Sequence, residues 1–308
     1  RRPPRSTLFP YTTLFRSSEI TGTYKRFVQG DDWGCGVSKV TLSLDAPVDA
    51  VDADTFAVSE TKDATDWTDP EFAVTEQTFE LPVADAYLVD EAGEKTDAAS
   101  TQVAIEIAIS PSAASPFNYN MVTGRNTWVP YTMDIALADG ITITSDGTEV
   151  TSFSIDPAFT ATETSVDEFA VDEFTASDGT VYQYAHLEPE GGSKTLVVWL
   201  HGAGEGGTDP SIVSLGNKVT ALYEEEFQTV MGGAYVLTPQ TPTFWLEYNE
   251  EGAWQDNPGT NSVYLQTLME LIESYVAGHP AIDAQRIYVG GCSNGCSNGC
   301  GCNDCDRC

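Results

Sequence analysis

The hydrophobic pattern of this chain changes near residue 160, and this change restricts its possible folds more than any other feature of the sequence. Before it, short runs of β-prone residues are separated by Asp, Gly and Pro, and in residues 40–44 apolar and hydroxyl side chains alternate. Alternation with a period of two is typical of a strand that buries one face against a core. We therefore expect residues 18–160 to form an antiparallel, immunoglobulin-like β-sandwich.

Beyond a charged segment at residues 161–175, which we interpret as a linker, uninterrupted apolar runs alternate with segments of helical spacing. The expected strands are an alternating one at residues 180–187, buried ones at residues 196–200 and 234–238, and a short apolar one at residues 286–290. Helical spacing is found at residues 219–230 and 264–275. This order predicts a mostly parallel sheet with right-handed crossovers, in a three-layer α/β domain over residues 176–295. Ligands bind such sheets at the edge where the parallel strands end.

Two loops at that edge have a composition that indicates acyl transfer. Residues 291–295 read Gly-Cys-Ser-Asn-Gly and follow a strand directly, which fits the G-x-S-x-G pattern of a nucleophile elbow. The serine of such an elbow lies on a strained turn, so its neighbours must be small. Residues 201–207 read His-Gly-Ala-Gly-Glu-Gly-Gly, and glycines at this density let backbone N–H groups turn toward an oxyanion. A phosphate-binding loop is the alternative, but the Gly-Lys-Ser/Thr ending is missing.

A third loop, residues 239–260, is long for a connection in a compact domain and is rich in aromatic residues. Its tryptophans, Trp245 and Trp254, are candidates for contact with a substrate. The alternative, which the sequence leaves open, is that these rings only cover the sheet.

Residues 200–205, 239–240 and 286–295 resemble the esterase and predicted-peptidase branch of the α/β-hydrolase superfamily. Polyhydroxybutyrate depolymerase-like and feruloyl-esterase-like enzymes belong to this branch, and an immunoglobulin-like N-terminal domain occurs in it. The resemblance implies that Ser293 is the nucleophile and that Asn294 and either Gly202 or Ala203 donate backbone N–H groups to the oxyanion. It also implies a secreted or extracellular protein, an ester substrate that is small or linked to a polysaccharide, and neither cofactor nor metal.

The histidines do not fit a complete catalytic triad. In this fold the acid and the histidine follow the serine, yet His186, His201 and His279 all precede Ser293, and thirteen residues follow Gly295. We expect His201 to be a structural residue of the glycine-rich loop. We also expect a C-terminally truncated domain that is inactive as a triad hydrolase.

Both ends of the chain differ from the rest. Residues 1–17 repeat Thr-Leu-Phe and resemble translated sequencing-adapter read-through, and no signal peptide is visible in them. Residues 296–308 are rich in cysteine and copy the preceding motif, which favours a corrupted sequence. The C-x-x-C spacing of Cys302, Cys305 and Cys308 leaves a soft-metal site as the alternative.

The charge of the chain limits its partners. With 47 acidic against 14 basic residues, a nucleic-acid partner is disfavoured by repulsion. No run reaches the ~18 apolar residues of a membrane span. Two other functions remain open. A prolyl-oligopeptidase-like serine peptidase uses the same elbow and oxyanion hole. A non-catalytic carbohydrate-binding protein would stack sugars on Trp33, Trp67 and Trp128, although such rings are more often packed in a sandwich core.

Overall fold

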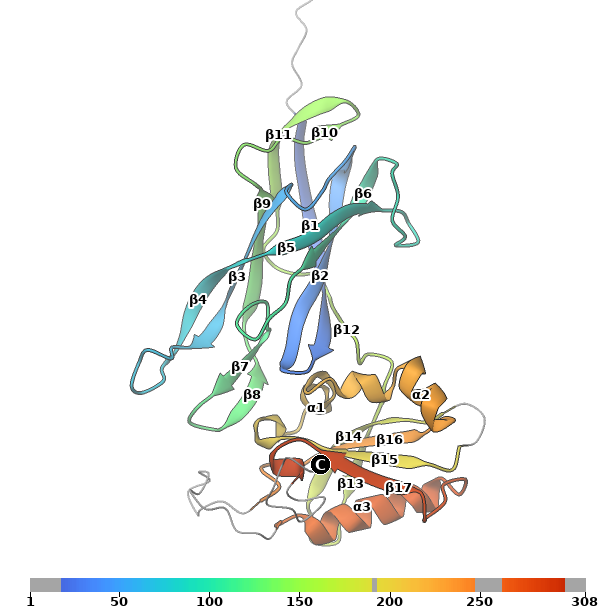
Figure 1. The fold of residues 1–308 in the computed structure, drawn as a ribbon. Coiled ribbons are helices and arrows are strands. Elements are labelled where there is room, and N and C mark those ends of the chain that lie inside the picture. Colours follow the sequence, from blue (N-terminus) through green and yellow to red (C-terminus); the bar gives the residue numbers. More distant parts are fainter. Residues whose placement is uncertain (1–17, 190–192, 247–261, 297–308) are drawn as a thin grey trace, which may run out of the picture.

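A computed structural model describes residues 18–189, 193–246 and 262–296 (Figure 1). The N-terminal half is built on a large sheet with the strand order β10-β11-β1-β2-β6-β5. Its strands are β1 (Ser18–Asp31), β2 (Gly34–Val48), β5 (Val83–Val89), β6 (Ser100–Ile107), β10 (Thr144–Ser145) and β11 (Thr148–Ile155). Opposite it lies a three-stranded sheet of β3 (Phe56–Thr65), β4 (Val74–Leu81) and β9 (Tyr131–Leu137). The hairpin of β7 (Phe117–Asn120) and β8 (Arg125–Trp128) extends toward the other half of the chain.

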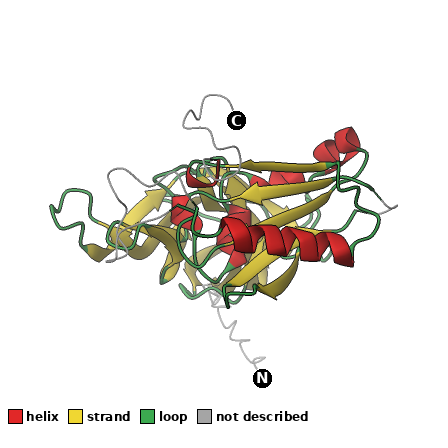
Figure 2. Cartoon of the chain, turned by 90° about the horizontal axis from the view of Figure 1, so that it is seen from below, coloured by secondary structure: helices red, strands yellow, loops and turns green. Residues whose placement is uncertain are grey.

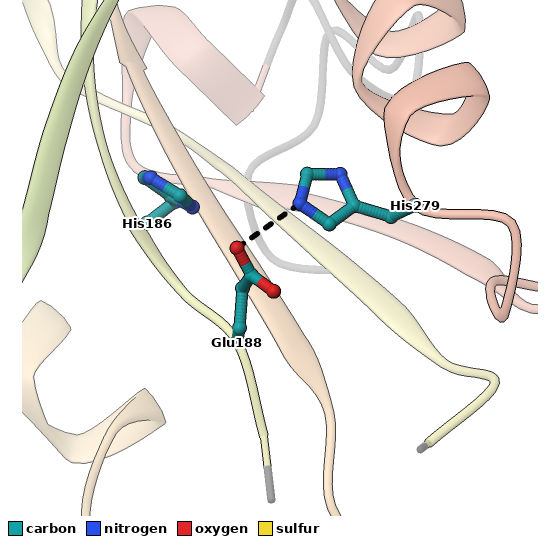
Figure 3. Close-up of side chains that lie close together, drawn as sticks. All are labelled: His186, Glu188 and His279. Carbon is teal, nitrogen blue, oxygen red and sulfur yellow. Dashed lines mark ion pairs between the residues drawn. The ribbon is translucent and has the colours of Figure 1, made fainter.

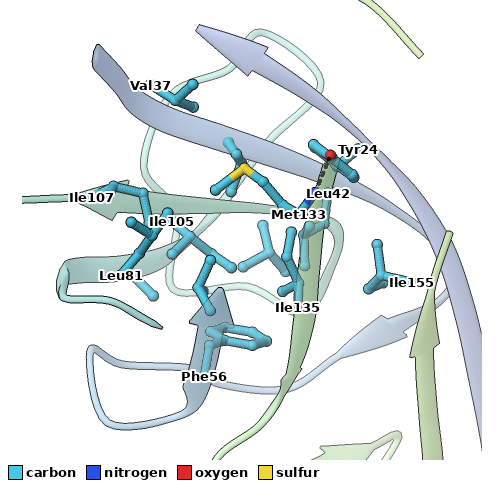
Figure 4. Close-up of a cluster of buried hydrophobic side chains, with 14 of the residues drawn as sticks. Tyr24, Val37, Leu42, Phe56, Leu81, Ile105, Ile107, Met133, Ile135 and Ile155 are labelled. Carbon is cyan, nitrogen blue, oxygen red and sulfur yellow. Dashed lines mark hydrogen bonds between the residues drawn. The ribbon is translucent and has the colours of Figure 1, made fainter. Parts of the chain in front are cut away.

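The two sheets enclose an apolar core, as the alternating pattern predicts (Figure 4). The Tyr24 hydroxyl joins them, because it accepts a hydrogen bond from the Met133 N–H at 3.0 Å and donates one to the Pro157 carbonyl at 3.0 Å. Most strand pairs of the sandwich are antiparallel, as expected, but β1 pairs in parallel with β11 and with β12 (Thr162–Thr164). Alternation of side chains is the same in either strand direction, so the sequence pattern did not reveal this.

The C-terminal half contains its own five-stranded sheet, called the second sheet below, with the strand order β13-β14-β16-β15-β17. Its strands are β13 (Ala170–Thr175), β14 (Val181–Leu187), β15 (Leu196–Leu200), β16 (Tyr235–Gln240) and β17 (Ile287–Gly291). Strand β15 pairs in parallel with β16 and with β17, which confirms the expected parallel core. Strands β13 and β14 add to it in antiparallel orientation.

The segment expected to be a linker, residues 161–175, contributes β12 and β13 to these sheets. Most side chains of β13 are exposed, while its backbone pairs with β14. The charged side chains indicated solvent contact correctly, but they carry no information on where the backbone hydrogen bonds go.

The longest helix, α3 (Leu265–Gly278), lies along the sheet, as Figure 2 shows, and buries the predicted apolar face. The single helix expected over residues 219–230 is wrong. The chain instead forms η2 (Val219–Leu222) and α2 (Glu225–Met231), separated by Glu224 in an extended conformation, and Val230 is 80% exposed. The other helices are η1 (Ala203–Glu205) and α1 (Pro210–Leu215). Because α1 and α2 are short, the full α/β/α layering remains a prediction.

The two halves share an apolar core. Ile212 and Leu215 of α1 are buried in the same cluster as the sandwich residues. Figure 1 shows α1 and α2 on the side of the second sheet that faces the sandwich, and α3 on the opposite side. Within the described segments, no helix has the length and apolar character needed to cross a membrane.

Candidate active site

Strand β17 ends at Gly291, and residues 294–296 already have helical conformation. Between them Ser293 has a φ of +50°, in the left-handed region that costs energy for any residue with a side chain. The turn is held by backbone hydrogen bonds from Cys292 to the Leu200 carbonyl at 3.0 Å and from Gly295 to the Cys292 carbonyl at 2.8 Å. Ser293 is exposed on this strained turn, at the edge where the parallel strands end.

The two glycines of the motif are required by close backbone contact. A Cβ atom on Gly291 would lie 2.6 Å from the Leu200 carbonyl oxygen and 2.9 Å from the Gly295 carbonyl carbon. A Cβ atom on Gly295 would overlap the carbonyl oxygens of Leu200 and His201. The turn therefore packs directly on the end of β15, as the small residues in the sequence predict.

The glycine-rich loop begins where β15 ends, and its first N–H group already has an acceptor. The Gly202 N–H donates to Glu205 Oε2 at 2.7 Å, because Glu205 turns back over the first turn of η1. Ala203, the other residue expected to donate to an oxyanion, is half-buried at the start of η1. In this conformation, a ligand would have to displace a carboxylate to reach the Gly202 N–H.

Glu205 was not singled out from the sequence, although it is the buried acid of this loop. Its Oε1 accepts a hydrogen bond from Asn217 Nδ2 at 2.5 Å, and the Cys292 thiol donates to Asn217 Oδ1 at 3.2 Å. Burial raises the pKa of Glu205 to about 7, against the lowering effect of its two hydrogen bonds. The network connects the glycine-rich loop to the residue before Ser293. Its sequence signal was an acid three residues after Gly202, the spacing of a capping box.

His201 is fully buried and has a structural role, as expected. Its Nδ1 bonds to the Gly202 carbonyl at 2.6 Å, and its Nε2 accepts from the Thr241 N–H at 3.1 Å. Burial lowers the pKa of His201 to about 4, so the ring is neutral at physiological pH. Both ring nitrogens are engaged inside the domain, which leaves neither for the Ser293 hydroxyl.

Trp245 packs beneath the site. The structure therefore favours the interpretation that this ring covers the sheet over the interpretation that it contacts a substrate. It is fully buried, its Nε1 donates to the His201 carbonyl at 2.9 Å, and its backbone N–H donates to Asn294 Oδ1 at 2.8 Å. The Asn294 side chain thus fastens the turn to the segment after β16. Trp254, the other candidate, lies outside the described residues.

The other two histidines lie near the opposite edge of the sheet. The His279 ring centroid is 5.4 Å from that of Tyr235, the first residue of β16, whereas Ser293 follows the last residue of β17. His186 lies beside His279, with 6.4 Å between the ring centroids. Of the three histidines in the chain, none is placed to accept the proton of Ser293 in the described structure.

Trp33 and Trp67 line one groove of the sandwich, with a volume of about 490 Å³. Polar side chains share its lining, including Gln77, Asn118 and Asn126. Trp128 lies elsewhere and is a packing residue, because its ring meets Phe117 edge-on at 4.6 Å and its Nε1 donates to Ser211 Oγ at 3.3 Å.

Comparisons with known proteins agree with this architecture. Residues 23–151 match the family model described as the esterase Ig-like N-terminal domain. A solved structure described as a thermostable esterase aligns at 20% identity and a TM-score of 0.66, covering 89% of this chain and 72% of that one. Acylaminoacyl peptidase from Pyrococcus horikoshii aligns at 16% identity and a TM-score of 0.30, covering 83% of this chain and 32% of that one. No curated protein matches by sequence. The family model supports an immunoglobulin-like N-terminal domain of the kind found in esterases, and the thermostable esterase supports the same overall fold.

Proposed function

We propose that this chain carries the nucleophile of a serine carboxylic-ester hydrolase of the α/β-hydrolase type. The observation that carries the proposal is the φ of +50° at Ser293, in a strand–turn–helix segment that packs on the end of β15 through two obligatory glycines. A strained turn of this kind presents a serine hydroxyl at the edge of a sheet, and strain of this size is retained where function requires it.

In the proposed reaction, the Ser293 hydroxyl oxygen attacks the carbonyl carbon of the ester as a base removes its proton. The backbone N–H groups of Asn294 and Ala203 stabilise the oxyanion, and Gly202 joins them where the Glu205 carboxylate yields its place. Collapse of the tetrahedral intermediate expels the alcohol and leaves an acyl-enzyme, which water then hydrolyses.

None of the three histidines of this chain is placed to act as the base that removes the proton of Ser293 in the described structure. His201 is engaged on both nitrogens, and His186 and His279 lie near the other edge of the sheet. We therefore propose that the chain as given shows no serine-dependent turnover. Removing the base of a triad costs on the order of 10⁴ to 10⁶ in rate.

The test compares this chain with the product of the natural gene that contains it, using an aryl ester as substrate. In the gene product, Ser293→Ala should lower turnover by on the order of 10⁴. The matched control is Ser152→Ala, at an exposed position of β11 in the sandwich. Loss of activity in the control alone, or serine-dependent turnover by the chain as given, would contradict the proposal.

The substrate class we propose is an extracellular ester, either small or linked to a polysaccharide. A peptidase is the nearest alternative, because acyl transfer from an amide uses the same nucleophile and oxyanion hole. Turnover of aminoacyl anilides at rates equal to those of aryl esters would favour the peptidase.

Carbohydrate binding is a second candidate, and the groove lined by Trp33 and Trp67 favours it. Trp67 is 64% exposed and offers a ring face on which a sugar can stack, beside amide side chains that can bond to hydroxyl groups. Affinity electrophoresis in soluble polysaccharide gels tests this. Trp67→Ala should remove any retardation, while Val122→Ala, at a position that is 81% exposed, should not. Unchanged retardation in Trp67→Ala would exclude this groove.

A further inference from the structure

Near the sheet edge opposite Ser293, two histidines and a carboxylate converge from different elements (Figure 3). His186 comes from β14, Glu188 follows the end of that strand, and His279 caps α3. One ligand atom from each lies within 4.8 Å of the others, and His279 Nε2 is 3.2 Å from Glu188 Oε1. Asp172 of β13 adds a second carboxylate, with its Oδ2 3.4 Å from His186 Nε2.

Both imidazole rings are held by the same residue, Tyr275. His279 Nδ1 donates to the Tyr275 carbonyl at 2.7 Å, which leaves the lone pair on Nε2 in the neutral ring. His186 Nδ1 bonds to the Tyr275 hydroxyl at 3.1 Å. Metal-binding histidines are oriented in this way, with the outer nitrogen bonded to a backbone carbonyl or a polar side chain and the other directed at the ion.

His186 gives the independent sign that a ligand belongs here. Its side chain is 7% exposed, and among the described residues its Nε2 has no partner in hydrogen-bond geometry, although Asp172 Oδ2 lies 3.4 Å away. A buried polar atom without a partner is costly and calls for a specific explanation. The His186 ring lies beside Glu188 and His279, so an ion bound by this cluster provides one.

We propose that His186, His279 and the Glu188 carboxylate, each through one ligand atom, bind a divalent transition-metal ion of the zinc class. Two imidazoles with a carboxylate are a donor set that suits zinc and leaves the fourth position to water. A tetrahedral zinc at about 2.0–2.1 Å holds its ligands roughly 3.4 Å apart, so the side chains must close by on the order of 1 Å. The side chain of Glu188, which is 57% exposed, has the freedom to do so.

The ion would join β14 and the C-terminal end of α3. Strand β13 is the outermost strand of the sheet and β14 is its neighbour, so the proposed site links this side of the sheet to the helix that covers one face. It is separate from the proposed ester site, and its loss leaves the Ser293 turn in place.

The test is a calorimetric titration with Zn²⁺ in the presence of excess Mg²⁺, which occupies weak carboxylate sites on this acidic surface. The full chain is used, and its tail thiols are first removed because thiolates bind zinc themselves: Cys300→Ser, Cys302→Ser, Cys305→Ser and Cys308→Ser. We expect one site per chain. Its affinity should fall at least about tenfold in Glu188→Gln and in His279→Gln. It should be unchanged in Glu168→Gln, which removes an equal charge at an exposed position elsewhere.

A second readout does not depend on the folding of the histidine variant. Zn²⁺ should raise the Tm of the parent and of Glu168→Gln, but not that of Glu188→Gln, whose exposed side chain can be replaced without disturbing a core. Failure of the parent to bind zinc would overturn the proposal. Equal zinc affinity in Glu188→Gln and Glu168→Gln would do the same, and the contact would then be an ordinary His279–Glu188 ion pair.

Discussion

At the scale of single residues, Glu205 and His201 are two buried titratable residues of the glycine-rich loop. Their contributions to the stability of the fold change with pH in opposite directions. Burial raises the pKa of Glu205 to about 7, above its ordinary value of 4.5, so the folded state prefers the protonated acid. Stability from this group is complete below pH 4.5 and is lost as pH rises toward 7. Burial lowers the pKa of His201 to about 4, so its contribution is complete above pH 6.5 and is lost as pH falls.

Glu205→Gln should therefore separate the two effects. The wild type should lose about 3 kcal/mol of unfolding free energy relative to the variant between pH 4.5 and 7.5, since one pKa unit corresponds to about 1.4 kcal/mol. The variant should lose stability only on the acid side, through His201. Urea unfolding of both proteins at pH 5 and pH 8 measures this difference. An equal difference at the two pH values would mean that the Glu205 carboxyl titrates normally.

At the Ser293 turn, the sequence predicted only those residues whose role depends on a small side chain. Gly291 and Gly295 are both required by the close contact with β15, and the G-x-S-x-G motif predicts them. The partner of the Gly202 N–H was not predictable, because it depends on the Glu205 side chain turning inward, whereas an acid is normally exposed. The positions of the three histidines relative to Ser293 followed from strand direction alone.

At the scale of elements, the end of β17 leaves little room for added volume. Gly291→Ala would place a methyl group 2.6 Å from the Leu200 carbonyl oxygen, and the backbone would have to move. We expect a loss of at least about 1–3 kcal/mol in unfolding free energy, together with release of the strained Ser293 turn. Chemical denaturation measures the first effect.

The adjacent residue provides the control for this prediction. A Cβ atom on Gly290 would meet only Trp199, at 3.8 Å, which is an ordinary contact. Gly290→Ala should be neutral or stabilising by up to about 1 kcal/mol, because alanine restricts the unfolded chain. Equal destabilisation by both substitutions would show that strand β17, and not the turn, is sensitive.

Elements with strong periodicity were predicted well, and those fixed by tertiary contacts were not. Strands β15 and β16 are buried apolar runs, and helix α3 buries the apolar face that its periodicity indicates. Strand β17 was expected from an apolar run too, although Tyr288 and Val289 in it are exposed. The segment of η2 and α2 has helical spacing over its whole length, but Glu224 interrupts it with an extended backbone. Strand β12 has three residues, and its pairing with β1 depends on a partner 136 positions away.

At the scale of the whole molecule, the sandwich and the second sheet are packed together through α1. Leu215 is fully buried in the sandwich cluster, although it belongs to a helix of the C-terminal half. Polar contacts reinforce this, including a bond from the Lys218 N–H to the Asp31 carbonyl at 2.8 Å. Phe169 also stacks on Tyr223, with 3.6 Å between ring centroids. No sequence pattern distinguished a residue buried against its own domain from one buried against the other.

This shared core predicts that the two halves unfold together. Leu215→Ala should lower the unfolding free energy by about 2–5 kcal/mol, the usual range for a fully buried leucine. Because the lost contacts are those between the halves, the single transition should also split into two. Differential scanning calorimetry measures both effects. Val230→Ala, at a position that is 80% exposed, should change stability by less than about 0.5 kcal/mol and keep one transition. Two transitions in the wild type itself would mean that burial of α1 against the sandwich contributes too little to couple the halves.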